Sequence, residues 1–243
     1  MLELIDVTKR YGDTVAVNGI TLRIGSGEFF ALLGPNAAGK TTTVKMIAGL
    51  LRPTSGQLTI AGHDCACDGI RARSILGFVP DIPFLYDKLT VAETLDFAAC
   101  VYELPVEERE RAREEMLSLF PLARERDLLV EQLSHGLRQR LVFSMAMIHR
   151  PRLMVVDEPF VGLDPRSMRT VKDVLKDCAR GGGAVFMSTH TLSAAEELAD
   201  RIGIIMGGRI IALGSPGELK QQAGGAHQLE EAFLQITEED AGS

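Results

Sequence analysis

The fold interpretation starts from Gly34-Pro35-Asn36-Ala37-Ala38-Gly39-Lys40-Thr41, which Thr42 follows. These residues match the P-loop pattern GxxxxGK(S/T), and they lie between a short apolar run at 29–33 and a predicted helix over 41–51. Small residues allow consecutive backbone N–H groups to surround a β-phosphate, and the helix that follows directs its positive end toward it. We expect Lys40 to reach the β- and γ-phosphates and the Thr41 hydroxyl to bind Mg²⁺. The stretch therefore predicts a nucleoside triphosphate site formed by residues 34–42.

A second motif places two carboxylates after an apolar segment, in the order Leu153-Met154-Val155-Val156-Asp157-Glu158. Four consecutive apolar residues favour a strand buried on both faces, which brings Asp157 to its carboxyl end. There Asp157 can hold Mg²⁺ through water, and Glu158 can act as general base on the attacking water. Many apolar strands end in an acid, so this motif indicates a catalytic site only in combination with the P-loop.

Strand and helix patterns alternate along the rest of the chain. We predict strands over 2–8, 21–24, 57–60, 75–79, 184–189, 202–206 and 209–212, and helices over 91–102, 107–119, 138–149 and 165–179. Gly207-Gly208 predicts a hairpin between the last two strands. The expected fold is α/β: a P-loop core around a mainly parallel sheet, an N-terminal antiparallel β subdomain and an inserted helical subdomain. We expect one domain over 1–220, with the helical subdomain over about 84–150, and a short tail over 221–243.

The composition narrows the choice of partners and compartment. The chain has 243 residues, with 33 acidic against 26 basic side chains and a net charge of −7, so nucleic acid is not an expected partner. No run of 18 apolar residues and no secretory signal are present. Four cysteines are too few for a disulfide framework, which favours the cytosol. The residues around Cys65 and Cys67 include metal-ligand types, but their spacing matches no zinc pattern.

A third motif, Leu133-Ser134-His135-Gly136-Leu137 with Gln139-Arg140 behind it, resembles the LSGGQ…QR signature of ATP-binding cassette proteins of the transporter type. The resemblance runs from about 2 to 212. It implies a head-to-tail pair of cassettes, each presenting its Ser134 and Gly136 to ATP on the P-loop of the other. It also implies that Tyr11 stacks on adenine, that His190 is the catalytic switch histidine beside Glu158 and Lys40, and that Gly162-Leu163-Asp164 is the D-loop.

Several positions depart from the family pattern. Ala37 replaces the usual P-loop glycine, which is tolerable at a negative φ and strained otherwise. His135 and Leu137 replace signature residues, and Val161 replaces the usual serine of the D-loop. Asp81 stands where the family has the Q-loop glutamine, so the resemblance implies that it contacts the nucleotide and Mg²⁺, with a shorter reach and only accepting oxygens.

The resemblance implies an ATPase that powers transport by ATP-driven cassette dimerisation. It also implies a peripheral position on the inner face of the membrane, bound to a separate membrane-spanning chain. The segments 85–90 and 229–234 most resemble bacterial exporter cassettes, and the apolar residues 84–86 are candidates for the partner-facing surface. The cargo and the choice between homodimer and heterodimer stay open. The alternative is a cassette ATPase of DNA maintenance or translation, although the coiled-coil insertion of the first and the tandem cassettes of the second are not found. A small-molecule kinase or GTPase would lack the signature.

Overall fold

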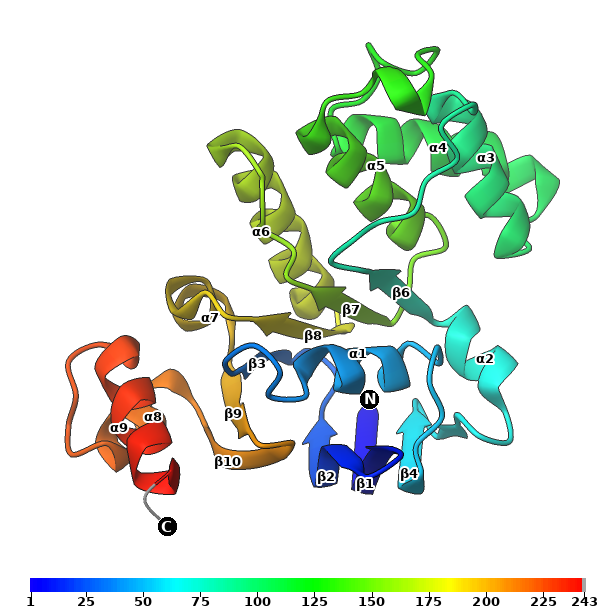
Figure 1. The fold of residues 1–243 in the computed structure, drawn as a ribbon. Helices are drawn as coiled ribbons and strands as arrows, with labels where there is room; N and C mark the ends of the chain where they lie inside the picture. Colours follow the sequence, from blue (N-terminus) through cyan, green and yellow to red (C-terminus); the bar gives the residue numbers. More distant parts are fainter. Residues whose placement is uncertain (242–243) are drawn as a thin grey trace.

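The computed structural model describes residues 1–241 and contains two β-sheets, with helices between and around them (Figure 1). The smaller sheet has the order β2-β1-β4-β5, and its neighbouring strands are all antiparallel. Its strands are β1 (Leu2–Tyr11), β2 (Thr14–Ile24), β4 (Ser55–Ile60) and β5 (His63–Asp64). This sheet is the expected antiparallel β subdomain. β2 begins earlier than predicted because its pairing with β1 continues to the turn at Gly12, where Tyr11 pairs with Thr14.

The larger sheet has the order β10-β9-β3-β8-β7-β6. Its strands are β3 (Phe29–Leu33), β6 (Leu76–Val79), β7 (Leu153–Asp157), β8 (Ala184–Thr189), β9 (Arg201–Met206) and β10 (Arg209–Gly214). All neighbours are parallel except β9 and β10, which form the predicted hairpin. β3, β7 and β8 are buried along their whole length, as their continuous apolar sequences predict. The α/β fold class with a mainly parallel core sheet is therefore confirmed.

The P-loop helix α1 (Lys40–Ile47) lies between the two sheets (Figure 1). Val44, Met46 and Ile47 are buried and share a hydrophobic core with Leu4 of the small sheet and Phe30 of the large one. The prediction that the helix reaches residue 51 is wrong. Gly49 adopts a φ of +72°, and the amides of residues 50 and 51 both donate to the carbonyl of Lys45, which turns the chain away.

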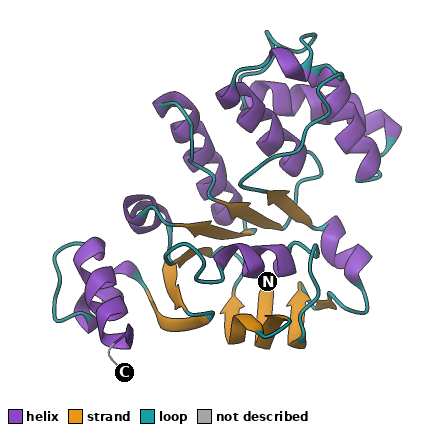
Figure 2. Cartoon of the chain, in the orientation of Figure 1, coloured by secondary structure: helices purple, strands orange, loops and turns teal. Residues whose placement is uncertain are grey.

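The helical subdomain consists of α3 (Val91–Val101), α4 (Val106–Leu119), a short 3₁₀ turn (Val130–Gln132) and α5 (His135–Met147). Figure 1 shows these helices grouped on one side of the large sheet, and Figure 2 shows loops connecting them to it. Thr90 begins α3 with a reciprocal capping box to Glu93. The helix α6 (Pro165–Arg180) follows β7 and packs against β8.

Four further helices were not predicted. They are α2 (Gly69–Ser74), α7 (Leu192–Leu198), α8 (Pro216–Gln222) and α9 (Leu229–Ala241). Leu229 and Ala232 of α9 are buried, and α9 contacts α7, α8 and β10. Most of the predicted tail is therefore packed helix; residues 242 and 243 lie outside the described residues. No helix within residues 1–241 combines the length and the apolar character needed to cross a membrane.

Candidate active site

The P-loop connects the end of β3 to the start of α1, and its glycines are required by close backbone contacts. A Cβ atom at Gly34 would collide with the carbonyl oxygen of Ile205. Gly39 has a φ of +109°, and a Cβ atom there would lie 2.5 Å from the carbonyl oxygen of Ala16. Ala37 has a φ of +63°. This is the left-handed region, which costs an L-residue roughly 1–2 kcal/mol. The alanine that replaces the usual glycine is therefore strained here.

The Lys40 side chain folds back over the loop that precedes it. Its Nζ atom donates to the carbonyl oxygens of Gly34, at 2.7 Å, and Pro35, at 3.0 Å. The residue is only 7 % exposed. Burial lowers the pKa of the Lys40 ammonium, while the negative charges of Glu158 and Asp157 oppose that shift. Lys40 is thus a partly desolvated cation held beside two carboxylates. Pro35, Asn36 and Ala37 are exposed at the tip of the loop, and Ala38 is buried beneath them.

Asp157 ends β7 and is buried. Burial raises the pKa of its carboxyl, and the negative charges of Asp81 and Glu158 add to this shift. Hydrogen bonds from the hydroxyls of Ser188 and Thr41 lower the same pKa. The structure therefore brings Thr41, from the start of α1, and Asp81, from the loop after β6, to the same carboxylate.

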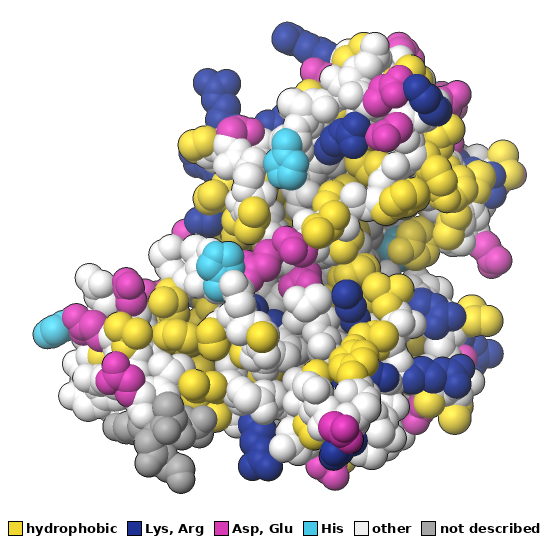
Figure 3. Space-filling model, in the orientation of Figure 1, with side chains coloured by type: hydrophobic (Ala, Val, Ile, Leu, Met, Phe, Trp, Pro, Cys, Tyr) yellow, Lys and Arg dark blue, Asp and Glu magenta, His cyan; other side chains and the backbone are white. Residues whose placement is uncertain are grey.

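Glu158 follows Asp157 in a left-handed conformation, with a φ of +49°. Its amide donates to the carbonyl oxygen of Ser188 at 3.0 Å, which ties this turn to the neighbouring strand β8. The two carboxylate oxygens have separate partners. Oε1 lies 2.9 Å from Nδ1 of His190, and Oε2 accepts a hydrogen bond of 3.1 Å from the Thr189 hydroxyl. In Figure 3, acidic side chains gather beside a histidine in the hollow between the helical subdomain and the lower part of the molecule.

The Ser188 hydroxyl donates to Asp157 and the Thr189 hydroxyl donates to Glu158, but neither residue was among the predicted site residues. Their signal in the sequence is the hydroxyl pair that immediately precedes His190 at the end of a predicted strand. Parallel pairing of β7 with β8 sets Asp157 opposite Ser188. The two hydroxyls therefore lie at the same sheet edge as the carboxylates.

The signature residues lie elsewhere, at the start of α5. Ser134 is the N-cap residue, and its hydroxyl accepts a 3.4 Å hydrogen bond from the amide of Leu137. Gly136 follows in the first turn. Across residues 1–241, no hydrogen bond or ion pair joins Ser134 or Gly136 to the P-loop. A single chain therefore holds the phosphate-binding loop and the signature as two separate surfaces.

The signature helix is connected to the D-loop. Arg140 donates to the Ser167 hydroxyl at 2.8 and 3.1 Å, and Asp164 caps α6 by accepting from the amide of Ser167. A Cβ atom at Gly162 would lie 2.7 Å from Nε2 of His135, so the imidazole ring packs directly on the D-loop. His135, a departure from the family pattern, thus fills space between these two segments.

Tyr11 lies apart from the carboxylates, at the end of β1. Its side chain is 48 % exposed, and Nζ of Lys9 lies 5.3 Å from the centre of its ring. One face of the ring is therefore near a cation, and much of the ring is open to solvent.

An aromatic cluster lies on the surface beyond Asp81. Phe84 packs edge-to-face on Tyr86, which packs edge-to-face on Phe97 of α3, with ring centres 5.5 Å apart in each pair. Phe84 is 80 % exposed. The rings of Phe84 and Phe97 border an apolar cavity of about 250 Å³ between the loop after β6, α3 and α5, with Leu85 in its lining.

Comparison with known proteins gives one consistent family. The profile of the family described as "ABC transporter" matches residues 17–161. The chain is 36 % identical over 237 residues to a linearmycin resistance ATP-binding protein of Bacillus subtilis, covering 98 % of this chain and 75 % of that one. It is 32 % identical over 243 residues to the ABC-type transporter ATP-binding protein EcsA of Bacillus subtilis, covering 100 % and 98 %.

Solved structures agree with these relatives. The fold is similar to a structure titled as an ATP-binding subunit of an ABC transporter, with a TM-score of 0.92, 32 % identity and coverage of 98 % and 99 %. It is also similar to the dimeric ATP-binding cassette MJ0796 in a post-hydrolysis state bound to ADP and phosphate. That comparison has a TM-score of 0.80, 27 % identity and coverage of 88 % and 98 %.

Proposed function

The chain belongs to the ABC transporter family and is an ATP-hydrolysing subunit of a membrane transporter; we propose that it powers export through a separate membrane-spanning chain. The export direction is supported by relatives named for fluoroquinolone export and Nod factor export. The relatives compared are transporter subunits, and no observation favours a role in DNA maintenance or translation.

The assignment of the hydrolytic residues rests on one observation, the convergence of Lys40, Asp157 and Glu158 at the end of β7. Lys40 balances negative charge on the β- and γ-phosphates and leaves the Gly34 and Pro35 carbonyls when ATP binds. Glu158 takes a proton from the attacking water as general base. His190 and Thr189 hold its two carboxylate oxygens in position.

Asp157 and two residues near it fit Mg²⁺. Thr41, Asp157 and Asp81 offer the oxygen ligands that Mg²⁺ prefers. The raised pKa of Asp157, caused by burial and by the charges of Asp81 and Glu158, indicates uncompensated negative charge that a divalent cation would balance. Bound there, Mg²⁺ would supply charge neutralisation on the β- and γ-phosphate oxygens.

We assign Ser134 and Gly136 to the ATP held by a second cassette. In one chain they are not connected to the P-loop, whereas the start of α5 presents free amide groups suited to a phosphate. Tyr11 is assigned to the adenine ring because an exposed aromatic ring can stack on a base, and β2, which pairs with Tyr11, approaches the P-loop where Ala16 lies against Gly39.

The aromatic cluster of Phe84, Tyr86 and Phe97 is proposed to receive the membrane-spanning chain, which would hold the ATPase at the inner face of the membrane. Large exposed aromatic rings bordering an apolar cavity are typical of protein interfaces. Asp81 is three residues before Phe84 in the chain and its charge acts on Asp157, so we propose that it couples the docked partner to the carboxylates.

ATP hydrolysis by Lys40→Ala tests the site assignment. We expect turnover to fall at least about 100-fold, because the variant lacks the cation that balances phosphate charge in the transition state. Lys45→Ala is the matched control, since Lys45 is an exposed lysine in the last turn of the same helix. A Lys40→Ala protein within twofold of wild-type turnover would remove the P-loop assignment.

A further inference from the structure

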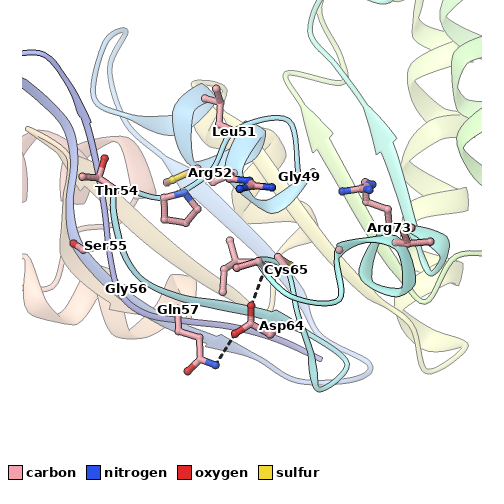
Figure 4. Close-up of a pocket in the computed structure, with 16 residues that line it drawn as sticks. Gly49, Leu51, Arg52, Thr54, Ser55, Gly56, Gln57, Asp64, Cys65 and Arg73 are labelled. Atoms are coloured by element: carbon pink, nitrogen blue, oxygen red, sulfur yellow. Dashed lines mark hydrogen bonds between the residues drawn. The ribbon is translucent and has the colours of Figure 1, made fainter.

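A cavity of about 420 Å³ lies at the far end of α1 from the P-loop (Figure 4). It is bounded by the end of α1 with the loop that follows it, by β4, and by the segment from β5 into α2. Its apolar wall contains Met46 and Leu58, which are buried, and Leu51, which is partly buried.

Two arginines line this cavity without acidic partners. Arg52 follows α1, and Arg73 belongs to α2; neither forms an ion pair with any residue of the described chain. Figure 4 shows their guanidinium groups pointing toward one another from opposite sides. Like charges arranged in this way repel, and an oxyanion between them would accept hydrogen bonds from both forks.

The other polar groups of the cavity leave this positive charge in place. Asp64, an acid in the cavity lining, uses one oxygen to accept from Gln57 and the other to accept from the amides of Ala66 and Cys67. The Cys65 thiol adds no negative charge, because burial, together with the charge of Asp64, raises its pKa to about 11. Two cations thus face one carboxylate whose oxygens are already hydrogen-bonded.

An apolar groove continues from the arginine side of this cavity. A second cavity, of about 410 Å³, shares Ile70 and Arg73 with the first and is also lined by Leu76, Phe78 and Val101. Ile70 is 78 % exposed on the boundary between the two. Charge at one end and an apolar channel at the other fit an elongated amphiphilic molecule with an anionic head.

We propose that these cavities bind a phosphate ester that carries an apolar chain, with its phosphate between Arg52 and Arg73 and its chain along Ile70. The site is distinct from the ATP site, because α1 separates the two. The same chemistry is offered by a soluble alkyl phosphate and by an anionic phospholipid of a bilayer.

Calorimetric titration of the full-length chain with decyl phosphate, below its micelle concentration, tests this proposal. Saturating ADP and Mg²⁺ keep the P-loop filled, so that heat from the probe reports another site. Arg52→Gln and Arg73→Gln should each weaken binding about tenfold or more, because each removes a charge-assisted hydrogen-bonding group. Arg71→Gln is the matched control: it removes an equal charge from the same helix as Arg73 but lies outside the cavity lining.

Arg71→Gln should bind within twofold of wild type, and thermal melting of each variant checks that it is folded. No binding by the wild type in ADP, or equal binding by all four proteins, would overturn the proposal. Flotation with phosphatidylcholine vesicles, with and without phosphatidylglycerol, distinguishes a bilayer phospholipid from a soluble alkyl phosphate as the ligand. Flotation that depends on phosphatidylglycerol, Arg52 and Arg73 assigns the head group to a bilayer lipid. Decyl phosphate binding without such flotation assigns it to a soluble ester.

Discussion

Nδ1 of His190 lies 2.9 Å from Oε1 of Glu158, and the residue before this histidine, Thr189, donates to Oε2 of the same carboxylate. Both partners come from the end of β8, whereas Glu158 follows β7. The parallel pairing of these two strands therefore fixes the direction of the carboxylate. A carboxylate held at both oxygens has few rotamers available, which favours one position for the water that it activates.

Glu158→Gln should reduce ATP hydrolysis at least about 100-fold, because an amide keeps the shape of the side chain but does not accept the proton of water. ATP should still bind and, because it is not cleaved, should hold two chains together. Size-exclusion chromatography should therefore give a monomer without nucleotide and a dimer with ATP, but not with ADP. Glu196→Gln, on α7, is the control and should hydrolyse ATP normally. Near wild-type phosphate release by Glu158→Gln would take the base role from this residue.

Adding Ser134→Arg to Glu158→Gln tests whether the dimer uses the signature. The new side chain would occupy the start of α5, where we place the γ-phosphate of the second cassette. The double variant should bind ATP with little change and remain a monomer. A dimer that survives this substitution would place the contact between the two chains elsewhere.

Asp157→Asn should stabilise the nucleotide-free protein at neutral pH while reducing its ATPase activity. The folded-state pKa of Asp157 is raised, first by burial and then by Asp81 and Glu158. A raised carboxyl pKa means that ionisation costs more in the folded than in the unfolded chain. The penalty is fully present above the folded pKa and disappears as the pH falls below the unfolded value of about 4.

Melting curves from pH 7 down to about pH 4 check this prediction. The variant should melt above wild type at pH 7, and the difference should shrink toward acid pH. Glu197→Gln is the contrasting control: hydrogen bonding to Lys172 lowers the pKa of Glu197, so this variant should melt below wild type at pH 7. If Asp157→Asn melts below wild type at pH 7, hydrogen bonds to the carboxylate already offset the cost of burying its charge.

Ala37→Gly should raise the melting temperature of the nucleotide-free protein by about 2 °C. The substitution relieves a left-handed alanine, worth roughly 1–2 kcal/mol, and part of this gain is offset by the greater freedom of glycine in the unfolded chain. Ala38→Gly is the matched control, since Ala38 is buried and has no positive φ. It should lower the melting temperature. The reverse order of the two variants would exclude strain at residue 37.

Asp81→Gln, which restores the amide of the family pattern, should leave ATP affinity within about twofold of wild type. It should change the hydrolysis rate or its stimulation by the membrane-spanning chain, because we place this side chain in contact with Mg²⁺ or the attacking water only after closure. The comparison requires basal and partner-stimulated rates of both proteins. Equal values in both assays would contradict a coupling role.

The sequence was most informative where one local pattern decides the structure. The strands at 29–33 and 184–189 were predicted with the observed bounds, because continuous apolar runs end at glycine or at polar residues. The first helix was predicted too long because Leu51 continues the apolar face of Val44 and Ile47. The backbone of Gly49, and not that face, decides where the helix ends.

Contacts between distant segments account for what was missed. The hydrogen bonds of Ser188 and Thr189 to the carboxylates cross from one strand to another, and their residues are 31 positions apart in the chain. α9 was missed because its apolar residues gain a partner only when α7 and α8 pack against it. The P-loop, by contrast, was predicted from one local sequence pattern, although its glycines also make room for the distant carbonyls of Ile205 and Ala16.

The helical subdomain leaves the large sheet after Val79, at the carboxyl end of β6, and returns at Leu153, the amino end of the neighbouring strand β7. Leu153 lies opposite Leu76, three residues before Val79, so the two points are about 10 Å apart along the strands. A body attached at two points turns most easily about the line through them. Here that line runs along the strands, so a rotation about it would keep the pairing of β6 with β7 but would disturb the core that Val79 shares with Val91 and Phe143. Beside this line a Cβ atom on Gly77 would lie 2.5 Å from both the carbonyl oxygen of Ala146 and the sulfur of Met154, so glycine is required where α5 packs on β6.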